Sequence, residues 1–322
     1  MEIKLDLRDK KILRELDMNA RVNYASLGKK VRLSKQVVKY RIEKLESLNV
    51  IQGYNALIDI SKLGDTIYVV YLKLVQISSI KEKEWIKKIE KHKSVLAVGK
   101  NAGQWDLTIA LRCDNNQDLD KNLKEIISDK SENIKEKLIT SEVEGSYFTM
   151  DVINKGKLQE TSTSESQNIE KIDKKDEEII AILSDNCRSS LLEISEKVKM
   201  SPNGIKNKIK NLEKKGIIIG YKTKINYEKL EYLHFRVFLH LSKFTPELYN
   251  NIKNFLKHKG NVESVSRYMG YADIDFRCYS KNILELYNLI SELKDNFLQN
   301  ILGVDSMPIF RWESINYYSR NL

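Results

Sequence analysis

Apolar residues recur with the spacing of α-helices in three short stretches of the first fifty residues. Within each stretch they recur after three or four positions, with Ile12 and Leu13 adjacent in the first, and so fall on one helix face. The three stripes are Ile12, Leu13 and Leu16; Leu27 and Val31; and Val38, Ile42 and Leu45. Stripes this short predict three helices that converge on one small core.

A different pattern follows a short β-prone stretch. Runs rich in Val, Ile and Tyr alternate with two helical segments, with a turn at Gly103 between the middle runs. The predicted elements are strands at 66–76, 95–100, 106–112 and 138–148 and helices at 80–93 and 117–128. The order β-α-β-β-α-β is typical of a ferredoxin-like sheet with helices on one face.

Both patterns return later in the chain at a constant offset of 167 residues. The matched segments are 9–13 with 176–180, 19–21 with 186–188, 50–54 with 217–221, and Gly103 and Asp106 with Gly270 and Asp273. This period is too long for a solenoid repeat. It indicates a two-domain unit that has been duplicated and fused.

The predicted fold class is therefore α+β: two tandem copies of a winged helix-turn-helix, each followed by a ferredoxin-like βαββαβ domain. We place the winged domains at 1–54 and 170–221 and the ferredoxin-like domains at 55–152 and 222–322. Residues 153–169 are polar and rich in Ser and Thr, which predicts a flexible linker. A linker of this length can let the two copies pair within one chain.

Both third helices have a defined start. Ser34 and Ser201 stand where a side-chain oxygen can accept a hydrogen bond from a first-turn amide. Pro202 occupies the first helical position, where its missing N–H costs nothing.

The chain has 322 residues, 41% of them apolar, which suffices for a core in each domain. Its formal charge of +10 is concentrated in two segments: residues 1–60 carry +5 and residues 168–230 carry +4. This distribution favours a polyanion as the partner of the two winged domains. Lysine-rich helices that only keep a protein soluble are the alternative explanation.

The third helix of a small three-helix domain can enter the major groove of DNA when a tight turn precedes it. Long basic side chains reach phosphates or guanine edges, and glutamine can pair with adenine. The candidate contacts are Lys35, Gln36, Lys39, Tyr40, Lys44 and the flanking Arg41 in the first copy, and Asn203, Lys206, Asn207, Lys208 and Lys210 in the second. Two alternatives stay open: a merely solvated surface, or winged domains that serve dimerisation.

These residues resemble a known family. The matching positions are Asp9, Asn19-Ala-Arg21, Leu33-Ser34, Val38, Arg41-Ile42, Leu45-Glu46, Val50-Ile51 and Gly53-Tyr54. They are similar to the winged helix-turn-helix of the Lrp/AsnC (leucine-responsive, feast/famine) transcription factors, and the β-α-β-β-α-β unit resembles the ligand-sensing and assembly domain of that family. The resemblance covers almost the whole chain twice, whereas family members are usually a single unit.

The resemblance also implies a site for a small effector, often an amino acid, near the turn between the second and third strands. The family's Gly-x-x-Asp signature is matched by Gly103, Trp105 and Asp106 and by Gly270, Ala272 and Asp273. A glycine permits a tight turn with accessible amides, and an aspartate can accept from an ammonium group. The alternative is that both aspartates only cap their own turns. Because Trp105 aligns with Ala272, the two pockets cannot be equivalent.

The duplication implies an intrachain pseudo-dimer that presents two winged domains to double-stranded DNA. Family dimers pair their sensor sheets and place two winged domains on half-sites separated by whole helical turns. Within one chain the pairing does not depend on protein concentration, and the two recognition surfaces can diverge. We therefore expect non-identical half-sites, and we leave open whether pseudo-dimers assemble into a higher homo-oligomer.

Other kinds of site find little support in the sequence. Cys113, Cys187 and Cys278 are scattered, which argues against a disulfide framework or a zinc site and suggests half-buried thiols. We identify no metal-ligand cluster, catalytic arrangement or cofactor-binding loop. The apolar runs are far shorter than a membrane span, so we expect a cytoplasmic protein without membrane contact.

Two alternative functions remain. Sirohaem decarboxylases share this domain order, but their chemistry needs a patch of histidines, whereas His92, His234, His240 and His258 are not paired across the repeat. His234 and His240 lie six apart on one predicted strand, where a half-exposed histidine is more often structural. The other alternative is an oligomerising partner of family members that has lost DNA binding. We expect no enzyme.

Overall fold

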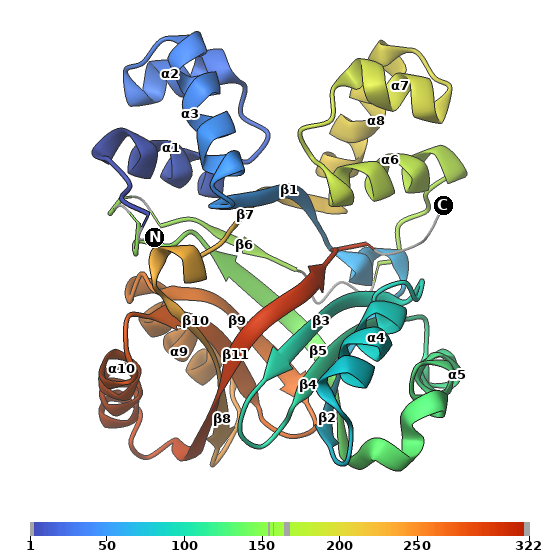
Figure 1. Ribbon diagram of the computed structural model, residues 1–322, viewed down its shortest axis with the longest axis vertical. Helices are drawn as coiled ribbons and strands as arrows, with labels where there is room; N and C mark the ends of the chain where they lie inside the picture. The colour runs from blue at the N-terminus through green and yellow to red at the C-terminus, as the bar shows by residue number, and fades with distance from the viewer. Residues whose placement is uncertain (1–2, 154, 157, 164–167, 319–322) are drawn as a thin grey trace.

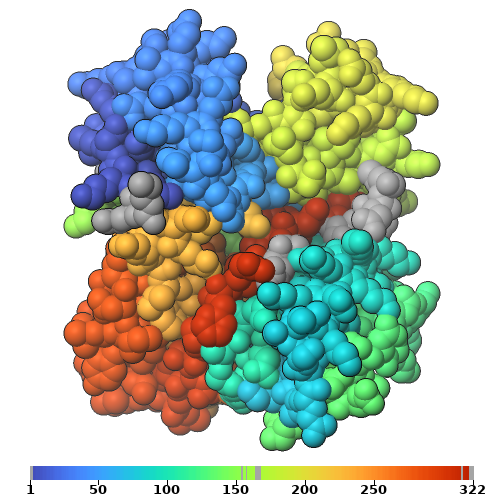
Figure 2. All heavy atoms as spheres, in the orientation of Figure 1, coloured from blue at the N-terminus to red at the C-terminus, as the bar shows by residue number. Residues whose placement is uncertain are grey.

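Each winged domain consists of three helices, as the sequence predicts. The computed structural model describes residues 3–318 except 154, 157 and 164–167. The first domain contains α1 (Leu7–Met18), α2 (Tyr24–Val31) and α3 (Lys35–Ser47), and the second contains α6 (Lys174–Asp185), α7 (Leu191–Val198) and α8 (Pro202–Lys214). The predicted apolar stripes are buried in both copies. The two domains lie side by side on the same side of the molecule (Figure 1) and form separate lobes there (Figure 2).

The predicted starts of the third helices are confirmed. Ser34 Oγ accepts a hydrogen bond from the Val37 amide at 3.3 Å, and Ser201 Oγ accepts from the Gly204 amide at 3.2 Å. Pro202 is the first residue of α8.

The stretch after each third helix forms a strand that joins the two copies. β1 (Ile51–Ile58) pairs antiparallel with β7 (Ile218–Ile225), with Tyr54 opposite Thr223. The sequence indicated only a short β-prone stretch here, and in the structure the two stretches satisfy each other's backbone groups. Short 3-10 turns, η1 (Ile60–Leu63) and η3 (Glu228–Leu230), then lead into the ferredoxin-like domains.

Both ferredoxin-like domains have the predicted β-α-β-β-α-β order. The first contains β2 (Thr66–Leu74), α4 (Ser79–Ile89), β3 (Val95–Asn101), β4 (Leu107–Cys113), α5 (Asn116–Ile127), η2 (Ser128–Asn133) and β5 (Ile134–Phe148). The second contains β8 (Leu233–Leu241), α9 (Pro246–His258), β9 (Val262–Met269), β10 (Ile274–Ser280), α10 (Ile283–Asn296) and β11 (Ile301–Ile315). The helices cover the outer faces of the sheets (Figure 1).

The two sheets join into a closed ring. Its strand order is β2-β4-β3-β11-β8-β10-β9-β5, and β5 pairs back to β2. The last strand of each ferredoxin-like domain therefore pairs with the second strand of the other ferredoxin-like domain: β11 pairs with β3, and β5 pairs with β9. Residues 134–141 of β5 pair with β2 and residues 141–147 pair with β9, and β11 likewise pairs with β8 over 301–309 and with β3 over 309–315. The two copies thus share one backbone hydrogen-bond network.

The linker is more ordered than we predicted. Glu160–Ser162 forms a strand, β6, that pairs with β5, and the Glu160 carboxylate contacts Lys253 and Lys257 on α9 at 3.1 and 2.9 Å. Residues 154, 157 and 164–167 of the predicted linker lie outside the described residues. Residues 160–162 are therefore held between β5 of the first ferredoxin-like domain and α9 of the second.

The cysteines differ from the prediction of half-buried thiols. Cys113, Cys187 and Cys278 are all buried and unpaired by disulfides, and burial raises the pKa of each thiol. Among the described residues, no helix combines the length and apolar character needed to cross a membrane.

Candidate nucleic-acid interface

The polar faces of the two third helices are exposed, because burial of the apolar stripes turns the opposite faces outward. On α3 the exposed candidates are Lys35, Gln36, Lys39, Tyr40 and Lys44, and on α8 they are Asn203, Lys206, Asn207 and Lys210. The Tyr40 side chain is 67% exposed, so its ring and hydroxyl are accessible to a partner. Each helix thus presents cations and hydrogen-bonding groups on one surface.

Arg41 and Lys208, two of the predicted DNA contacts, also form ion pairs within their own winged domains. Arg41 pairs with Asp6 and Asp9 at 2.6 and 2.7 Å, and Lys208, at the equivalent position, pairs with Asp173 and Asp176 at 2.7 and 2.9 Å. In both copies the cation thus ties the recognition helix to the start of the first helix. We call each of these ion-pair clusters a latch.

The acidic side of each latch is a helix cap that the sequence analysis missed. Asp6 and Asp9 form a reciprocal capping box at the start of α1, and Asp173 and Asp176 do the same at α6. Burial opposes the effect, but the Asp9 amide and the Arg41 guanidinium hold the pKa of Asp6 below its ordinary value. The Asp-x-x-Asp spacing, repeated in both copies, was the signal available in the sequence.

A tight turn separates the second and third helices in both winged domains. Arg32 ends α2 with φ 56° and Lys199 ends α7 with φ 55°, both in the left-handed region that closes a helix sharply. The third helices begin three residues later. This is the helix-turn-helix arrangement that positions a recognition helix.

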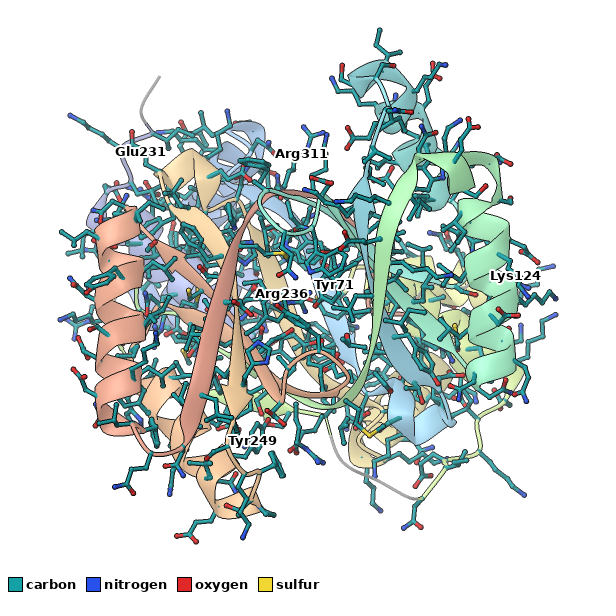
Figure 3. All side chains as sticks on the ribbon, turned by 90° about the horizontal axis from the view of Figure 1, so that it is seen from below. Tyr71, Lys124, Glu231, Arg236, Tyr249 and Arg311 are labelled. Carbon is teal, nitrogen blue, oxygen red and sulfur yellow. The ribbon has the colours of Figure 1, made fainter. Side chains whose placement is uncertain are left out.

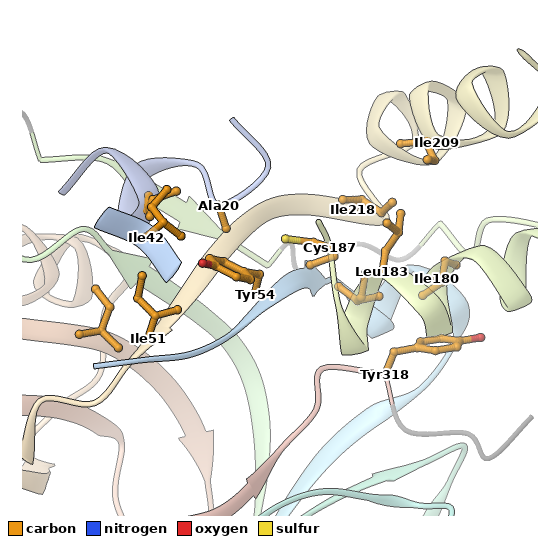
Figure 4. Packing of buried hydrophobic residues seen from close by; sticks show 14 of the residues in the cluster. Ala20, Ile42, Ile51, Tyr54, Ile180, Leu183, Cys187, Ile209, Ile218 and Tyr318 are labelled. Carbon is orange, nitrogen blue, oxygen red and sulfur yellow. The ribbon is translucent and has the colours of Figure 1, made fainter. Parts of the chain in front are cut away.

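The two winged domains are held together by reciprocal contacts. The Arg21 guanidinium donates to the Cys187 carbonyl, and Arg188, at the equivalent position, donates to the Ala20 carbonyl at 2.8 Å. Arg188 also lies over the Tyr54 ring, 5.0 Å from its centre. Side chains of both copies form one continuous apolar cluster around these contacts (Figure 4). The two recognition helices therefore have a fixed mutual arrangement.

The predicted effector turns lie at the far end of the ring. Because β2 enters the ring from the winged side and β3 runs parallel to it, Gly103 falls at the opposite end, and the repeat places Gly270 likewise. Both glycines have positive φ, 97° and 130°. The turns meet where Tyr271 Oη donates to Gln104 Oε1 at 3.0 Å. These two residues are equivalent in the repeat, so the pseudo-twofold axis passes between them.

The turn aspartates already have structural partners. Asp106 Oδ2 accepts from the Leu74 amide and Asp273 Oδ2 accepts from the Leu241 amide, both at 2.8 Å. Trp105 and Ala272 are buried in a small apolar cluster between the sheets. The aspartates therefore have a structural role, but at the ends of the neighbouring strands β2 and β8 and not within their own turns as the alternative proposed. These contacts leave an effector only the remaining surface of each turn.

His234 differs from the expectation of a half-exposed histidine. Its side chain is 5% exposed and stacks on Tyr279, with ring centres 4.2 Å apart. Burial lowers the pKa of His234 to about 3, so the imidazole is neutral. The described residues contain no group of three or more His, Cys, Asp or Glu side chains placed to hold a metal ion.

A buried charged cluster inside the ring was also missed. Arg236 Nε lies 2.8 Å from Asp275 Oδ2, an ion pair at hydrogen-bonding distance but with poor hydrogen-bond geometry. Arg277 and Glu142 lie nearby, and burial raises the pKa of Asp275. Arg236 and Tyr71 lie beside each other between the two sheets (Figure 3). The alternating strand pattern alone gave no sign that these charges face inward.

Comparison with known proteins places both winged domains in one family. A model described as winged helix-turn-helix DNA-binding matches residues 5–52 and again 172–219. An uncharacterised HTH-type transcriptional regulator of Pyrococcus furiosus is 35% identical over 138 residues, covering 42% of this chain and 89% of the relative. A second, from Pyrococcus horikoshii, is 38% identical over 106 residues, covering 33% of this chain and 68% of the relative.

A solved structure matches nearly the whole chain. The sirohaem decarboxylase NirDL has a TM-score of 0.63 with 12% sequence identity, covering 97% of this chain and 94% of its own. At this identity the likeness concerns the fold alone. The curated relatives, in contrast, match about one copy of the repeat and share the DNA-binding domain with this chain. The chain therefore belongs to the HTH-type transcriptional regulators, with the winged helix-turn-helix DNA-binding domain present twice.

Proposed function

We propose that this DNA-binding regulator acts as an intrachain pseudo-dimer whose two recognition helices read two non-identical half-sites on double-stranded DNA. The observation that carries the proposal is the pair of exposed polar faces on α3 and α8, held in one arrangement by β1, β7 and the reciprocal arginines. The faces differ at nearly every exposed position: Gln36 is replaced by Asn203 and Tyr40 by Asn207. Base contacts from different side chains favour different sequences.

The contacts proposed for DNA exclude the two latch cations. Lys35, Gln36, Lys39, Tyr40 and Lys44 in the first copy and Asn203, Lys206, Asn207 and Lys210 in the second keep their proposed role. Lysines among them would neutralise phosphates and make binding salt-dependent. Gln36, Asn203 and Asn207 would reach base edges.

Salt-dependent DNA binding tests the proposal. Replacing Lys35, Lys39 and Lys44 together by alanine removes cations without touching the apolar stripe, so the fold should persist. We expect the slope of log K against log salt to fall by about 0.9 for each phosphate that the variant no longer neutralises. Lys83 and Lys87 on the exposed side of α4 provide a matched control whose replacement should leave the slope unchanged. An equal decrease of the slope in both variants would contradict the proposal.

Footprinting tests the two half-sites separately. Genomic fragments retained by the protein should show two protected segments separated by about one helical turn or a multiple of it. Replacing Lys206 and Lys210 should weaken one segment and spare the other. A single uninterrupted footprint would rule out two half-sites.

We also propose that a small effector of amino-acid type tunes DNA binding at the turns formed by Gly103, Trp105 and Asp106 and by Gly270, Ala272 and Asp273. The support is their position on the pseudo-twofold axis, where a ligand would contact both copies. Replacing Gln104 with alanine should change the response of DNA affinity to amino acids without changing basal affinity. An unchanged response would remove these turns as the site.

An enzymatic role is the competing proposal. It draws on the NirDL fold and on the buried imidazole of His234. We infer a regulator without this activity, since both winged domains match the DNA-binding model. Incubation with sirohaem followed by mass spectrometry should return the starting compound. Loss of carboxyl groups from it would overturn this inference.

A further inference from the structure

A cavity of about 590 Å³ lies between the winged domains and the ferredoxin-like domain of the second copy. Its lining includes Lys222 and Lys224 on β7, His234 on β8, Glu263 on β9 and Trp312 on β11. Pockets of several hundred cubic ångströms with a few polar groups are the usual size for small-molecule sites. This cavity is separate from the turns at the far end of the ring.

Two polar groups of the cavity lack partners. His234 Nε2 makes no hydrogen bond with any described residue, although its side chain is 95% buried; the Glu263 carboxylate is 3.7 Å away. Among the described residues, no carboxylate lies within 4.0 Å of the half-buried Lys224 ammonium, and burial lowers the pKa of Lys224. Buried polar groups are normally hydrogen-bonded, so each unpaired group indicates a missing partner.

The other cations at the cavity are already engaged. Lys222 Nζ donates to the Phe148 carbonyl at 2.7 Å and lies 3.4 Å from Asp17. Arg311 on β11 lies close enough to Glu228 to favour the ionised form of its carboxyl, although burial raises the pKa of Glu228 overall. Glu90 favours the charged form of Lys224 but does not lie within 4.0 Å of it. Lys224 therefore supplies a positive charge without a close ion-pair partner, which fits a ligand with one negative charge.

The walls of the cavity are aromatic. Tyr227, Tyr279, Trp312 and Tyr317 all contribute to the lining. Tyr279 lies between His234 and Tyr227, with ring centres 4.2 and 4.3 Å away. Such rings favour stacking with a planar body over packing of a flexible aliphatic chain.

The first copy carries apolar residues at the positions of the polar groups. Ile67 and Leu96, which correspond to His234 and Glu263, line a different and smaller cavity of about 80 Å³ between the two sheets. Leu57 takes the place of Lys224. The unpaired imidazole and ammonium are thus specific to the second copy, and an ordinary packing role would not require either group.

We infer that the cavity binds an aromatic carboxylate that carries a polar substituent, such as a hydroxyl, at the far end of its ring. The carboxylate pairs with Lys224, the ring stacks among the tyrosines and Trp312, and the substituent hydrogen-bonds to His234 Nε2. Because the proposed site includes β7, which pairs with β1 across the two winged domains, the ligand would also influence their arrangement. That last consequence rests on the proposed function, but ligand binding itself does not.

Calorimetry on the full chain without DNA tests the site with three matched probes. These are 5-hydroxyindole-3-acetate, 5-hydroxytryptophol, which has an alcohol in place of the carboxylate, and indole-3-acetate, which lacks the ring hydroxyl. We expect the first to bind, the alcohol to bind at least about tenfold more weakly, and the unhydroxylated acid to bind several-fold more weakly. No binding of the first probe, or equal affinity for the acid and the alcohol, would overturn the inference.

Variants that place residues of the first copy at the equivalent positions of the second test whether the probes bind in this cavity. Lys224→Leu and His234→Ile introduce the residues found at Leu57 and Ile67. Lys224→Leu should lower the affinity for 5-hydroxyindole-3-acetate about tenfold or more but leave the affinity for 5-hydroxytryptophol unchanged. His234→Ile should make the affinities for the hydroxylated and unhydroxylated acids equal. Lys224→Gln, which keeps length and polarity, should reproduce the loss if charge is the cause. Lys243→Ala, at an exposed residue beyond β8, is the control; unchanged affinity in the Lys224 and His234 variants would refute the site.

Because the measurement omits DNA, failure of the proposed DNA contacts would leave its result intact. Conversely, a protein that binds DNA but none of the probes would disprove only the ligand site.

Discussion

The inner faces of the two ferredoxin-like sheets differ in polarity although they occupy equivalent places in the repeat. Where the first copy has Val69, Thr108 and Ala110, the second has Arg236, Asp275 and Arg277. The charges of the second copy lie against aromatic and acidic groups of the first: Arg236 is over Tyr71, and Tyr268 Oη donates to Glu142 at 3.1 Å. A charged inner face in one copy is therefore accommodated by a complementary face in the other.

Outside these inner faces, in contrast, the two copies use the same stabilising interactions. Each first helix carries an aspartate capping box, each latch ties that box to the recognition helix, and each turn aspartate accepts from a strand amide. The comparison teaches that a fused pair can keep identical scaffolds while its internal and recognition surfaces diverge. An unfused homodimer could not make its two inner faces different.

Among the substitutions considered, replacement of Asp275 on the inner face of the second copy should have the largest effect on stability. Asp275→Ala leaves the buried Arg236 without its carboxylate, which should lower the free energy of unfolding by about 3–5 kcal/mol. The double change Arg236→Val with Asp275→Thr installs the residues of the first copy and should cost less than the single change, because no unpaired charge remains. Urea unfolding measures both. A double variant less stable than Asp275→Ala would show that the polar face is needed as a whole.

The sequence was informative wherever structure depends on neighbours a few residues apart. The apolar stripes, the Ser34 and Ser201 caps and the order of strands follow from local spacing, and all are confirmed. Pairings between copies could not be predicted in this way. β1 with β7 and β5 with β9 join residues more than a hundred positions apart, and many registers would satisfy the same alternating pattern.

The candidate site shows the same limit. Exposure of Lys35 and Lys39 follows from the helix stripe, but Arg41 has the same charge and neighbouring position and yet binds Asp6 and Asp9 on another helix. His234 likewise lies on a strand whose second face is covered by the other copy, so strand alternation alone suggested partial exposure. In both cases the deciding partner is distant in sequence.

A smaller effect should come from the linker anchor, whose two lysines belong to the second copy and are not conserved in the first. Glu160 binds Lys253 and Lys257 on α9, and the equivalent positions on α4 are Ile86 and Glu90. Although burial opposes it, hydrogen bonds from the two lysines lower the pKa of Glu160 to about 2. Because this pKa lies below the value of about 4.5 expected in the unfolded chain, ionised Glu160 stabilises the folded protein at pH values above about 4.5. That stabilisation is lost as the pH falls from about 4.5 to about 2.

Glu160→Gln should therefore cost about 2 kcal/mol at pH 6 and progressively less towards pH 3. Urea unfolding of both proteins at the two pH values measures the difference. Glu132→Gln, at an exposed carboxylate of the first copy, is the control and should differ little from the unsubstituted protein at either pH. If Glu160→Gln lowers the free energy of unfolding by the same amount at both pH values, the ion pairs do not anchor the linker.

The smallest expected effect concerns the latches, where the two copies use different cations for one purpose. Arg41→Ala and Lys208→Ala should each lower the free energy of unfolding by about 1 kcal/mol, because each cation is only about three-quarters buried and one of its two carboxylates is more than half exposed. Arg41→Lys, which installs the cation of the second copy, should recover most of the loss.

Measurements of DNA affinity can then distinguish a structural role of Arg41 in the latch from a direct contact with a DNA phosphate. If Arg41 acts only on Asp6 and Asp9, Arg41→Ala lowers stability and leaves the salt dependence of DNA affinity unchanged, whereas Lys39→Ala reduces the salt slope with little effect on stability. The two residues lie on one helix and carry the same charge, so they form a matched pair. A reduced salt slope in Arg41→Ala at unchanged stability would return Arg41 to the DNA interface. It would also mean that Lys208, its counterpart in the second copy, should be tested for the same contact.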